Sequence, residues 1–549
     1  MKQNGFPSIK EKTERKLLLS GVLVLALANI LGKIFGFLYK VPLNSILGDE
    51  MANVNSAYAV YTTLYMISTA GIPIAVSVLI SESRARGGKT RVKGIYNVSM
   101  TALSIIGLIG TLIMIFTAGP VSRSNSDGDS FLCLCAIAPA LLFIAISSVY
   151  RGYFQGFGIM TPTAVSQIIE SFGKMIFGFG AAYVSMTVYG KDASTAAVFS
   201  IVGVTVGIAI GSLYLFSAKI YYDKKGLLSF SPVRENEGEE DLSSKALLYK
   251  IIAIALPIAL TSAVLSLASL VDAQLMRPLL TDFYGDAEYA KALYSDYSTG
   301  AVTMFNMPII LISPIACTIV PFISSAMAKG KREEANKLMS SALRMTSIIA
   351  APCALGLSAL ASPILALVFK GDSDMALHSG KLLSLLALSV FLVGMLSFTN
   401  AVLQANHLEK KPIISMLFGI AVKLSSSYFF IGKFGEIGAP ISTFMFYLTV
   451  VIFNFIFVVK DIGIRPDITN AFLRPFIASL LCAASALGVY KLLFERAGLA
   501  LSVVAAIIFA IIVYFVAVFV LKCIKEDDVI LLPHGDTVVK ILKKARLIR

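Results

Sequence analysis

Tryptophan is absent from this 549-residue chain, and histidine occurs only three times. Charged residues make up 15% of the sequence, whereas soluble proteins carry about 25%. So little charge excludes an ordinary soluble protein. Hydrophobic residues reach 57%, and long apolar runs recur from end to end. The sequence therefore predicts an all-α, polytopic membrane protein, in which tyrosine must supply the aromatic residues at the membrane interfaces.

The sequence offers no catalytic or metal-binding motif. It contains no HExxH-like cluster, no P-loop and no serine with an evident His/Asp constellation. Six cysteines lie in or beside apolar runs, and Cys133 and Cys135 are two residues apart, which directs them to different faces of a helix. "DGD" at 127–129 falls in a short outside loop, the wrong place for a cytosolic nucleotide. We therefore expect no enzyme activity, no metal site and no bound cofactor.

The apolar runs predict fourteen membrane spans. They lie near 17–39, 54–80, 95–119, 131–154, 163–187, 196–218, 249–272, 300–326, 341–369, 382–405, 412–431, 437–459, 471–490 and 498–521. With both termini inside, 34 of the 47 basic residues fall in inside segments and ten in outside loops. This bias predicts cytoplasmic termini, with the first sixteen residues as a tail and not a signal peptide. It also explains the net charge of +14 without a nucleic-acid partner.

The predicted organisation has two lobes of six spans and two further spans. We place a first lobe at 1–220, a cytoplasmic linker at 221–248, a second lobe at 249–459, spans 13 and 14 within 460–524, and a basic cytoplasmic tail at 525–549. The segment 273–299 is the longest predicted outside loop, and it is acidic and rich in tyrosine.

The two lobes resemble each other in sequence. Residues 150–175 align with 399–424, which pairs Gln155 with Gln404, Pro162 with Pro412 and, within one residue, Lys174 with Lys423. Residues 79–97 align with 321–339 at a similar separation. Lobes of six spans share one orientation, so the pattern favours parallel repeats, a transporter architecture with its site between the repeats, over coincidence.

Three lysines belong to neither the inside nor the outside count and lie within the predicted spans: Lys33, Lys174 and Lys423. The clearest acidic residues within the spans are Glu170 and Asp272. Each costs roughly 2.5–3.5 kcal/mol on insertion scales. Glu170 and Lys174 are four residues apart and share one helix face. One interpretation places the lysines around a polar cavity between the lobes, where they attract an anion. The other is structural: the lysines extend to an interface, or Glu170 and Lys174 only neutralise each other.

Three more polar residues are candidates at the inner ends of spans. Arg151 either meets an anionic headgroup or anchors its span on the inside, and Gln155 and Gln404 are candidate polar residues of the cavity. The basic residues between 84 and 93 predict a cytoplasmic loop on an anionic leaflet. The tail "VVKILKKARLIR" predicts a basic amphipathic segment on the inner surface.

Three stretches resemble a known family: "GKIFGFLYKVPLNSILG" (32–48), "STAGIPIAVSVLISESRARG" (68–87) and "RGYFQGFGIMTPTAVSQIIE" (151–170). They are similar to polysaccharide-biosynthesis flippases of the multidrug/oligosaccharidyl-lipid/polysaccharide (MOP) exporter superfamily, above all to the stage V sporulation protein B type and its lipid II flippase relatives. The resemblance covers essentially the whole chain. It implies two lobes in a V, as in MATE transporters, that alternate between inward- and outward-open. It also implies that spans 13 and 14 form a groove for a lipid tail.

The chain departs from the arginine pattern of those lipid II flippase relatives. Their first span carries a "GRxxGFxRD"-like motif, in which Lys33 and Tyr39 stand here at the two arginine positions. The second and eighth spans contain no arginine. An ammonium cannot form the bidentate fork that a guanidinium makes with a diphosphate. Only Lys33 therefore follows from the motif, whereas Arg151, Lys174 and Lys423 are assigned from position.

The resemblance implies a flippase of the bacterial cytoplasmic membrane that moves an undecaprenyl-diphosphate-linked saccharide, with lipid II as first choice, from the inner to the outer leaflet. Lys33, Arg151, Lys174 and Lys423 would bind the diphosphate. Coupling to the membrane potential, Na⁺ or H⁺ is open, with Glu170 and Asp272 as candidate carboxylates. Expected partners are the lipid-linked saccharide, membrane lipids and cell-wall synthesis proteins, in growth or sporulation. The alternatives are a MATE-like, cation-coupled exporter of drugs and a non-transporting scaffold for cell-envelope assembly.

Overall fold

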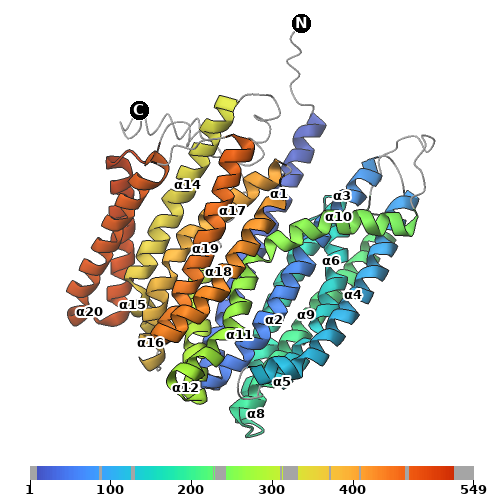
Figure 1. The fold of residues 1–549 in the computed structure, drawn as a ribbon. Coiled ribbons are helices and arrows are strands. Elements are labelled where there is room, and N and C mark those ends of the chain that lie inside the picture. Colours follow the sequence, from blue (N-terminus) through green and yellow to red (C-terminus); the bar gives the residue numbers. More distant parts are fainter. Residues whose placement is uncertain are drawn as a thin grey trace. The chain divides into compact units, whose positions relative to one another are not determined.

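The structure is a computed structural model that describes residues 9–85, 89–124, 130–226, 228, 243–309, 312, 332–369, 373–406, 408, 410–463 and 469–524. Within these ranges the chain forms helices and no strand (Figure 1). It divides into two compact units, Met1–Ser266 and Leu267–Arg549. The all-α prediction is confirmed. The predicted tail at 525–549 and most of the predicted linker lie outside the described residues.

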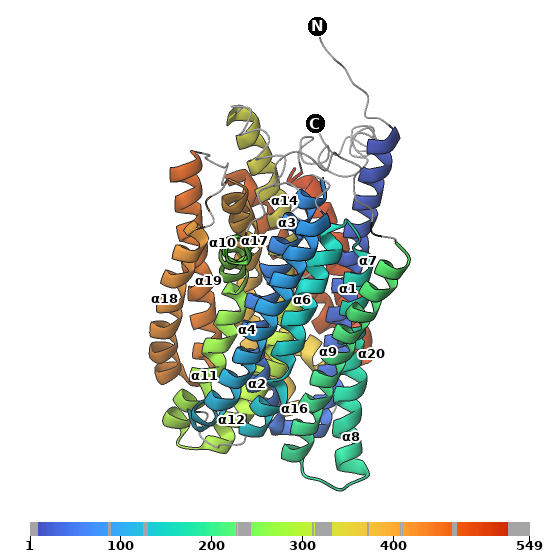
Figure 2. The same cartoon turned by 90° about the vertical axis from the view of Figure 1, so that its right-hand side faces the viewer.

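Unit 1 is a bundle of helices. Its elements are α1 (Ile9–Leu47), η1 (Gly48–Glu50), α2 (Met51–Ala70), α3 (Ile72–Ala85), α4 (Lys89–Ser124), α5 (Ser130–Ile137), α6 (Ala140–Gly156), α7 (Thr161–Gly173), the π-helical turn η2 (Lys174–Gly178), α8 (Phe179–Thr187), α9 (Ala193–Lys224) and α10 (Ser244–Ser262). Helix α10 runs crosswise to α3, α4 and α6: it extends from side to side in Figure 1 and is seen end-on in Figure 2.

A stripe of glycines brings two helices of unit 1 into backbone contact. Gly203, Gly207 and Gly211 recur every four residues on α9 and face α7 and η2. A Cβ on Gly207 would lie 2.7 Å from the backbone nitrogen of Lys174, and one on Gly203 would lie 2.2 Å from the carbonyl oxygen of Phe177. Small residues at such spacing let membrane helices approach closely. The stripe therefore fixes the position of the turn that begins at Lys174.

Unit 2 contains the rest of the helices. Its elements are α11 (Val264–Tyr284, which begins three residues before the boundary), α12 (Ala287–Ser295), the π-helical turn η3 (Asp296–Ala301), α14 (Arg332–Ala359), α15 (Ala361–Val368), α16 (Ser373–Leu386), α17 (Leu388–Ala405), α18 (Lys410–Phe434), η4 (Gly435–Ile437), α19 (Gly438–Phe457), η5 (Val458–Ile462), η6 (Thr469–Leu473) and α20 (Arg474–Val520).

Helix α20 is a hairpin of two helices that turns at Gly498, whose φ of 74° is accessible to glycine (Figure 1). The two arms pack through small side chains, among them Ala478, Cys482, Ala506 and Ala510. The hairpin corresponds to the predicted spans 471–490 and 498–521.

The membrane character is confirmed, but the spans differ in detail from the prediction. Seven described helices are long and apolar enough to cross a membrane, or eight if the bent pair α16–α17 forms one span. The count of fourteen stays a prediction. The segment of the predicted seventh span, 249–272, is broken at Ala263 between α10 and α11, and its single crossing stays a prediction.

The predicted outside loop at 273–299 is not an irregular loop, because this segment is almost entirely helical. Helix α11 continues to Tyr284, and α12 and η3 follow after a two-residue break. Gly285, with φ of 73°, ends α11, and the carboxylate of Asp286 accepts hydrogen bonds from the backbone nitrogens of Glu288 and Tyr289 to start α12. This capping signal is present in the sequence but was outweighed by the acidic composition.

Candidate functional site

The charged residues of unit 1 form a buried cluster of Arg151, Glu170 and Lys174, which we name the unit 1 cluster. One oxygen of Glu170, Oε2, accepts a hydrogen bond from Nη2 of Arg151 at 2.8 Å, and the other, Oε1, accepts one from Nζ of Lys174 at 2.9 Å. The side chains of Arg151, Glu170 and Lys174 are 4%, 7% and 16% exposed, respectively. Glu170 thus bridges two cations, which leaves the cluster with one surplus positive charge.

Three elements position this cluster. Arg151 lies in α6, five residues before its end, Glu170 lies in the last turn of α7, and Lys174 opens the π-helical turn η2. A π-helical turn adds a residue to the helical repeat and is frequent at functional sites. Helix α2 adds tyrosine rings: the centroids of Tyr58 and Tyr61 lie 6.0 and 5.9 Å from Nζ of Lys174. The ammonium therefore lies between a carboxylate and two aromatic rings.

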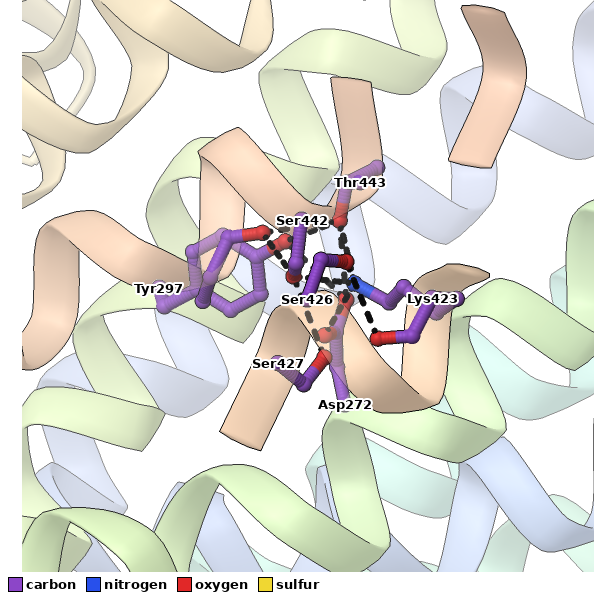
Figure 3. A network of polar contacts seen from close by, with 8 residues as sticks. Asp272, Tyr297, Lys423, Ser426, Ser427, Ser442 and Thr443 are labelled. Carbon is purple, nitrogen blue, oxygen red and sulfur yellow. Dashed lines mark hydrogen bonds and ion pairs between the residues drawn. The ribbon is translucent and has the colours of Figure 1, made fainter. Parts of the chain in front are cut away.

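Unit 2 holds a second buried cluster, the unit 2 cluster, made of Asp272, Tyr297, Lys423, Ser442 and Thr443 (Figure 3). The ammonium of Lys423 donates to Oδ1 of Asp272 at 2.5 Å, to Thr443 Oγ1 at 2.6 Å and to Ser442 Oγ at 3.0 Å. The second carboxylate oxygen, Oδ2, accepts from the Tyr297 hydroxyl at 3.1 Å. The side chain of Lys423 is 0% exposed, and the charges of the pair cancel.

The two lysines that aligned in sequence occupy corresponding positions in their units. Lys174 follows the first residue of α7 by the same number of residues as Lys423 follows the first residue of α18. Their counter-ions differ. The residue four positions before Lys423 is Gly419, so its carboxylate comes instead from Asp272 on α11. One lysine is neutralised within its own helix and the other by a distant helix.

Among the described residues, no hydrogen bond or ion pair joins the other predicted site residues to these two clusters. Lys33 is exposed on α1 and forms no ion pair or hydrogen bond with another described residue. Gln155 lies in the last turn of α6 and Gln404 in the last turn of α17; both are half-buried. Tyr39, at the second arginine position of the family motif, is buried and hydrogen-bonds Ser200 on α9.

Sequence reasoning did not single out three buried basic residues. Arg277 lies in α11, Lys291 in α12 and Arg344 in α14, and their exposed fractions are 1%, 7% and 4%. Arg277 and Lys291 fall in the acidic segment 273–299, which was predicted to be an outside loop, and Arg344 lies at the edge of the predicted span 341–369.

Comparison with known proteins identifies the family. The sequence profile of the family described as "Polysaccharide biosynthesis protein" matches residues 18–327, more than half of the chain. The chain belongs to this family.

Two curated relatives come from Bacillus subtilis strain 168. Stage V sporulation protein B is 24% identical over 525 residues, which cover 94% of this chain and 98% of that protein. Lipid II flippase MurJ is 23% identical over 459 residues, which cover 81% of this chain and 83% of that protein.

Two solved structures share the fold. Lipid II flippase MurJ in an inward closed conformation matches with a TM-score of 0.68 at 17% identity, over 91% of this chain and 98% of that one. An inward-facing multidrug resistance MATE transporter of the MOP superfamily matches with a TM-score of 0.60 at 16% identity, over 79% and 94%. The resemblance to polysaccharide-biosynthesis proteins, predicted from three sequence stretches, is confirmed by the family profile.

Proposed function

We propose that this protein is a flippase that moves an undecaprenyl-diphosphate-linked saccharide, with the peptidoglycan precursor lipid II as first choice, from the inner to the outer leaflet by alternating access. The observation that carries the proposal is the unit 1 cluster, in which Arg151 and Lys174 share a single carboxylate. A surplus cation among apolar helices is expensive unless an anion joins it, so the cluster favours an anionic ligand.

The chemistry of a diphosphate suits this cluster. A guanidinium makes two parallel hydrogen bonds to phosphate oxygens, and an ammonium adds a compact point charge. Lys33, exposed on α1, is a further cation for the same headgroup. The lipid II flippase MurJ among the relatives supports a lipid-linked diphosphate as the substrate class. In this proposal the protein performs no covalent chemistry, and its termini face the cytoplasm.

The unit 2 cluster has a different role in this proposal. The three donors of the Lys423 ammonium are all engaged by Asp272, Ser442 and Thr443, so none is left for a phosphate. Lys423 therefore binds substrate only in a conformation that opens this cluster.

An outward movement of negative charge is favoured by the membrane potential, by about 2.3 kcal/mol per charge per 100 mV.

The test is transport by the purified full-length protein in proteoliposomes. Fluorescent lipid II in the lumenal leaflet would be quantified by the fraction that an external quencher reaches with time. Two further arms would carry another undecaprenyl-diphosphate-linked saccharide and a lipophilic cationic dye. We expect lipid II transport above that of protein-free vesicles. Transport of the cationic dye without either lipid would contradict the proposal and favour the drug exporter, which shares the fold.

A further inference from the structure

Glu170 is placed between Arg151 and Lys174 as a phosphate group would be. Each of its two oxygens contacts a different cation, at 2.8 and 2.9 Å. A bound phosphate can likewise present separate oxygens to a guanidinium and an ammonium. In a bundle of apolar helices, two adjacent cations without a counter-ion would be strongly destabilising. The carboxylate therefore occupies the position that a substrate anion would take.

Several polar atoms on the helices that carry the unit 1 cluster and its tyrosine rings have no hydrogen-bond partner among the described residues. They are the Tyr61 hydroxyl, Thr163 Oγ1, Arg151 Nε and Gln167 Oε1. Thr163, Gln167, Glu170 and Lys174 follow at helical spacing along one face of α7 and into η2. Tyr61 and Thr163 are each 1% exposed.

Such atoms call for a partner, because more than about 90% of buried polar groups are hydrogen-bonded. Three of the four groups can donate: a phenol, an alcohol and a guanidinium N–H. Each oxygen of Glu170 accepts one hydrogen bond from a cation, whereas a diphosphate has more oxygens spread over a greater length. A diphosphate at this position can therefore also accept from donors that the carboxylate leaves without a partner.

We propose that Glu170 is an internal counter-anion that occupies a diphosphate subsite between Arg151 and Lys174, and that an incoming diphosphate displaces it and gains the Tyr61 hydroxyl as an additional donor. The exchange keeps an anion between the two cations throughout the cycle. When Glu170 returns, it competes for the same cations and releases the anion. The identity of the anion as a lipid headgroup rests on the proposed function, but the competition does not.

The test measures binding of inorganic diphosphate, without divalent cations, to the full-length protein in detergent micelles by calorimetry. In Glu170→Gln the competing charge is gone, and we expect affinity to rise about tenfold or more, the factor that corresponds to about 1.4 kcal/mol. The matched control is Asp223→Asn. Asp223 also pairs with a lysine four residues away, Lys219, which lies over two tyrosine rings, but at the end of α9. We expect no gain in affinity there.

A second variant keeps the test decisive if Glu170→Gln does not fold. Tyr61→Phe retains the ring beside Lys174 and removes a hydroxyl that has no partner among the described residues. We expect its thermal midpoint to equal or exceed that of the wild type, and its diphosphate affinity to fall about tenfold or more, as expected for one hydrogen bond to a charged group.

The outcomes separate the inference from the proposed function. A folded Glu170→Gln variant with unchanged diphosphate affinity would overturn the inference, as would a Tyr61→Phe variant that loses stability and keeps its affinity. Undecaprenyl diphosphate in mixed micelles should displace the inorganic anion from Glu170→Gln. If only the inorganic anion binds, the displaced-anion site stands, its ligand is a soluble phosphate, and the lipid flippase proposal fails.

Discussion

Removal of the ammonium from the unit 2 cluster should be among the most destabilising single changes in the chain. Lys423→Met keeps an unbranched side chain of similar length but leaves Asp272 with its side chain 6% exposed and no cation. Loss of one partner of a buried ion pair costs about 3–5 kcal/mol, because the remaining charge stays desolvated. Ser442 and Thr443 keep other partners in the carbonyl oxygen of Ala439, so the isolated carboxylate dominates the loss.

A double variant distinguishes this cause from simple loss of packing. In Asp272→Asn/Lys423→Met both charges are absent, so most of the lost stability should return, with an interaction energy of at least about 2 kcal/mol in the double-mutant cycle. Replacement of a whole buried pair is often close to neutral. The Tyr297 hydroxyl can still donate to the amide oxygen of the introduced asparagine, as it does to Oδ2 of Asp272.

The assay is unfolding of the purified protein in mixed micelles by titration with sodium dodecyl sulfate, followed by circular dichroism. The control is Lys433→Met, on the last turn of the same helix, where the lysine is exposed, lies over phenylalanine rings and forms no ion pair with another described residue. We expect that control to lie within about 0.5 kcal/mol of the wild type. The reasoning would be refuted if Lys423→Met lost as little stability as the control. It would also be refuted if the stability effects of Asp272→Asn and Lys423→Met were strictly additive in the double variant.

Two other predictions follow from the packing of each unit. Gly207→Leu should lower the thermal midpoint and the yield of folded protein, because even a Cβ would lie 2.7 Å from the backbone nitrogen of Lys174; Gly180→Leu, with nothing within 4 Å of its Cβ, should be tolerated. Asn454→Leu should lower the free energy of unfolding by about 1–3 kcal/mol in the same assay. The reason is that Nδ2 of Asn454 donates at 2.7 Å to the side chain of Asn400, which would lose this partner. Equal effects of the two glycine variants, or an unchanged Asn454→Leu stability, would contradict these accounts.

Local signals in the sequence were enough to predict the helical fold class and one ion pair. Apolar runs predicted the helices, and the four-residue spacing predicted that Glu170 and Lys174 meet. The sequence could not predict that Arg151 joins them, because its position at the end of a span suggests a membrane anchor. Nor could it predict the contact between Asp272 and Lys423, which are 151 residues apart and meet only when α11 packs on α18.

Backbone features of both clusters also could not be predicted from the sequence. The π-helical turns at Lys174 and at Asp296–Ala301 depend on tertiary packing, which at η2 is the close approach of the α9 glycines. The GxxxGxxxG spacing at 203–211 is visible in the sequence, and interpreted as a helix contact it would have indicated a partner, although not which one. The crosswise α10 carries an ordinary apolar run, so hydropathy alone predicts a span there.

The central claim is that the cations of the unit 1 cluster bind an anionic lipid substrate. Its most direct test compares lipid II transport in proteoliposomes between two variants, Lys174→Gln and Lys219→Gln. Both lysines pair with a carboxylate four residues away and lie near two tyrosine rings, but Lys219 lies in the last turns of α9. We predict that Lys174→Gln loses most of its transport while folded, and that Lys219→Gln retains it. Wild-type transport that survives Lys174→Gln unchanged would reduce the unit 1 cluster to a structural ion pair and contradict the account.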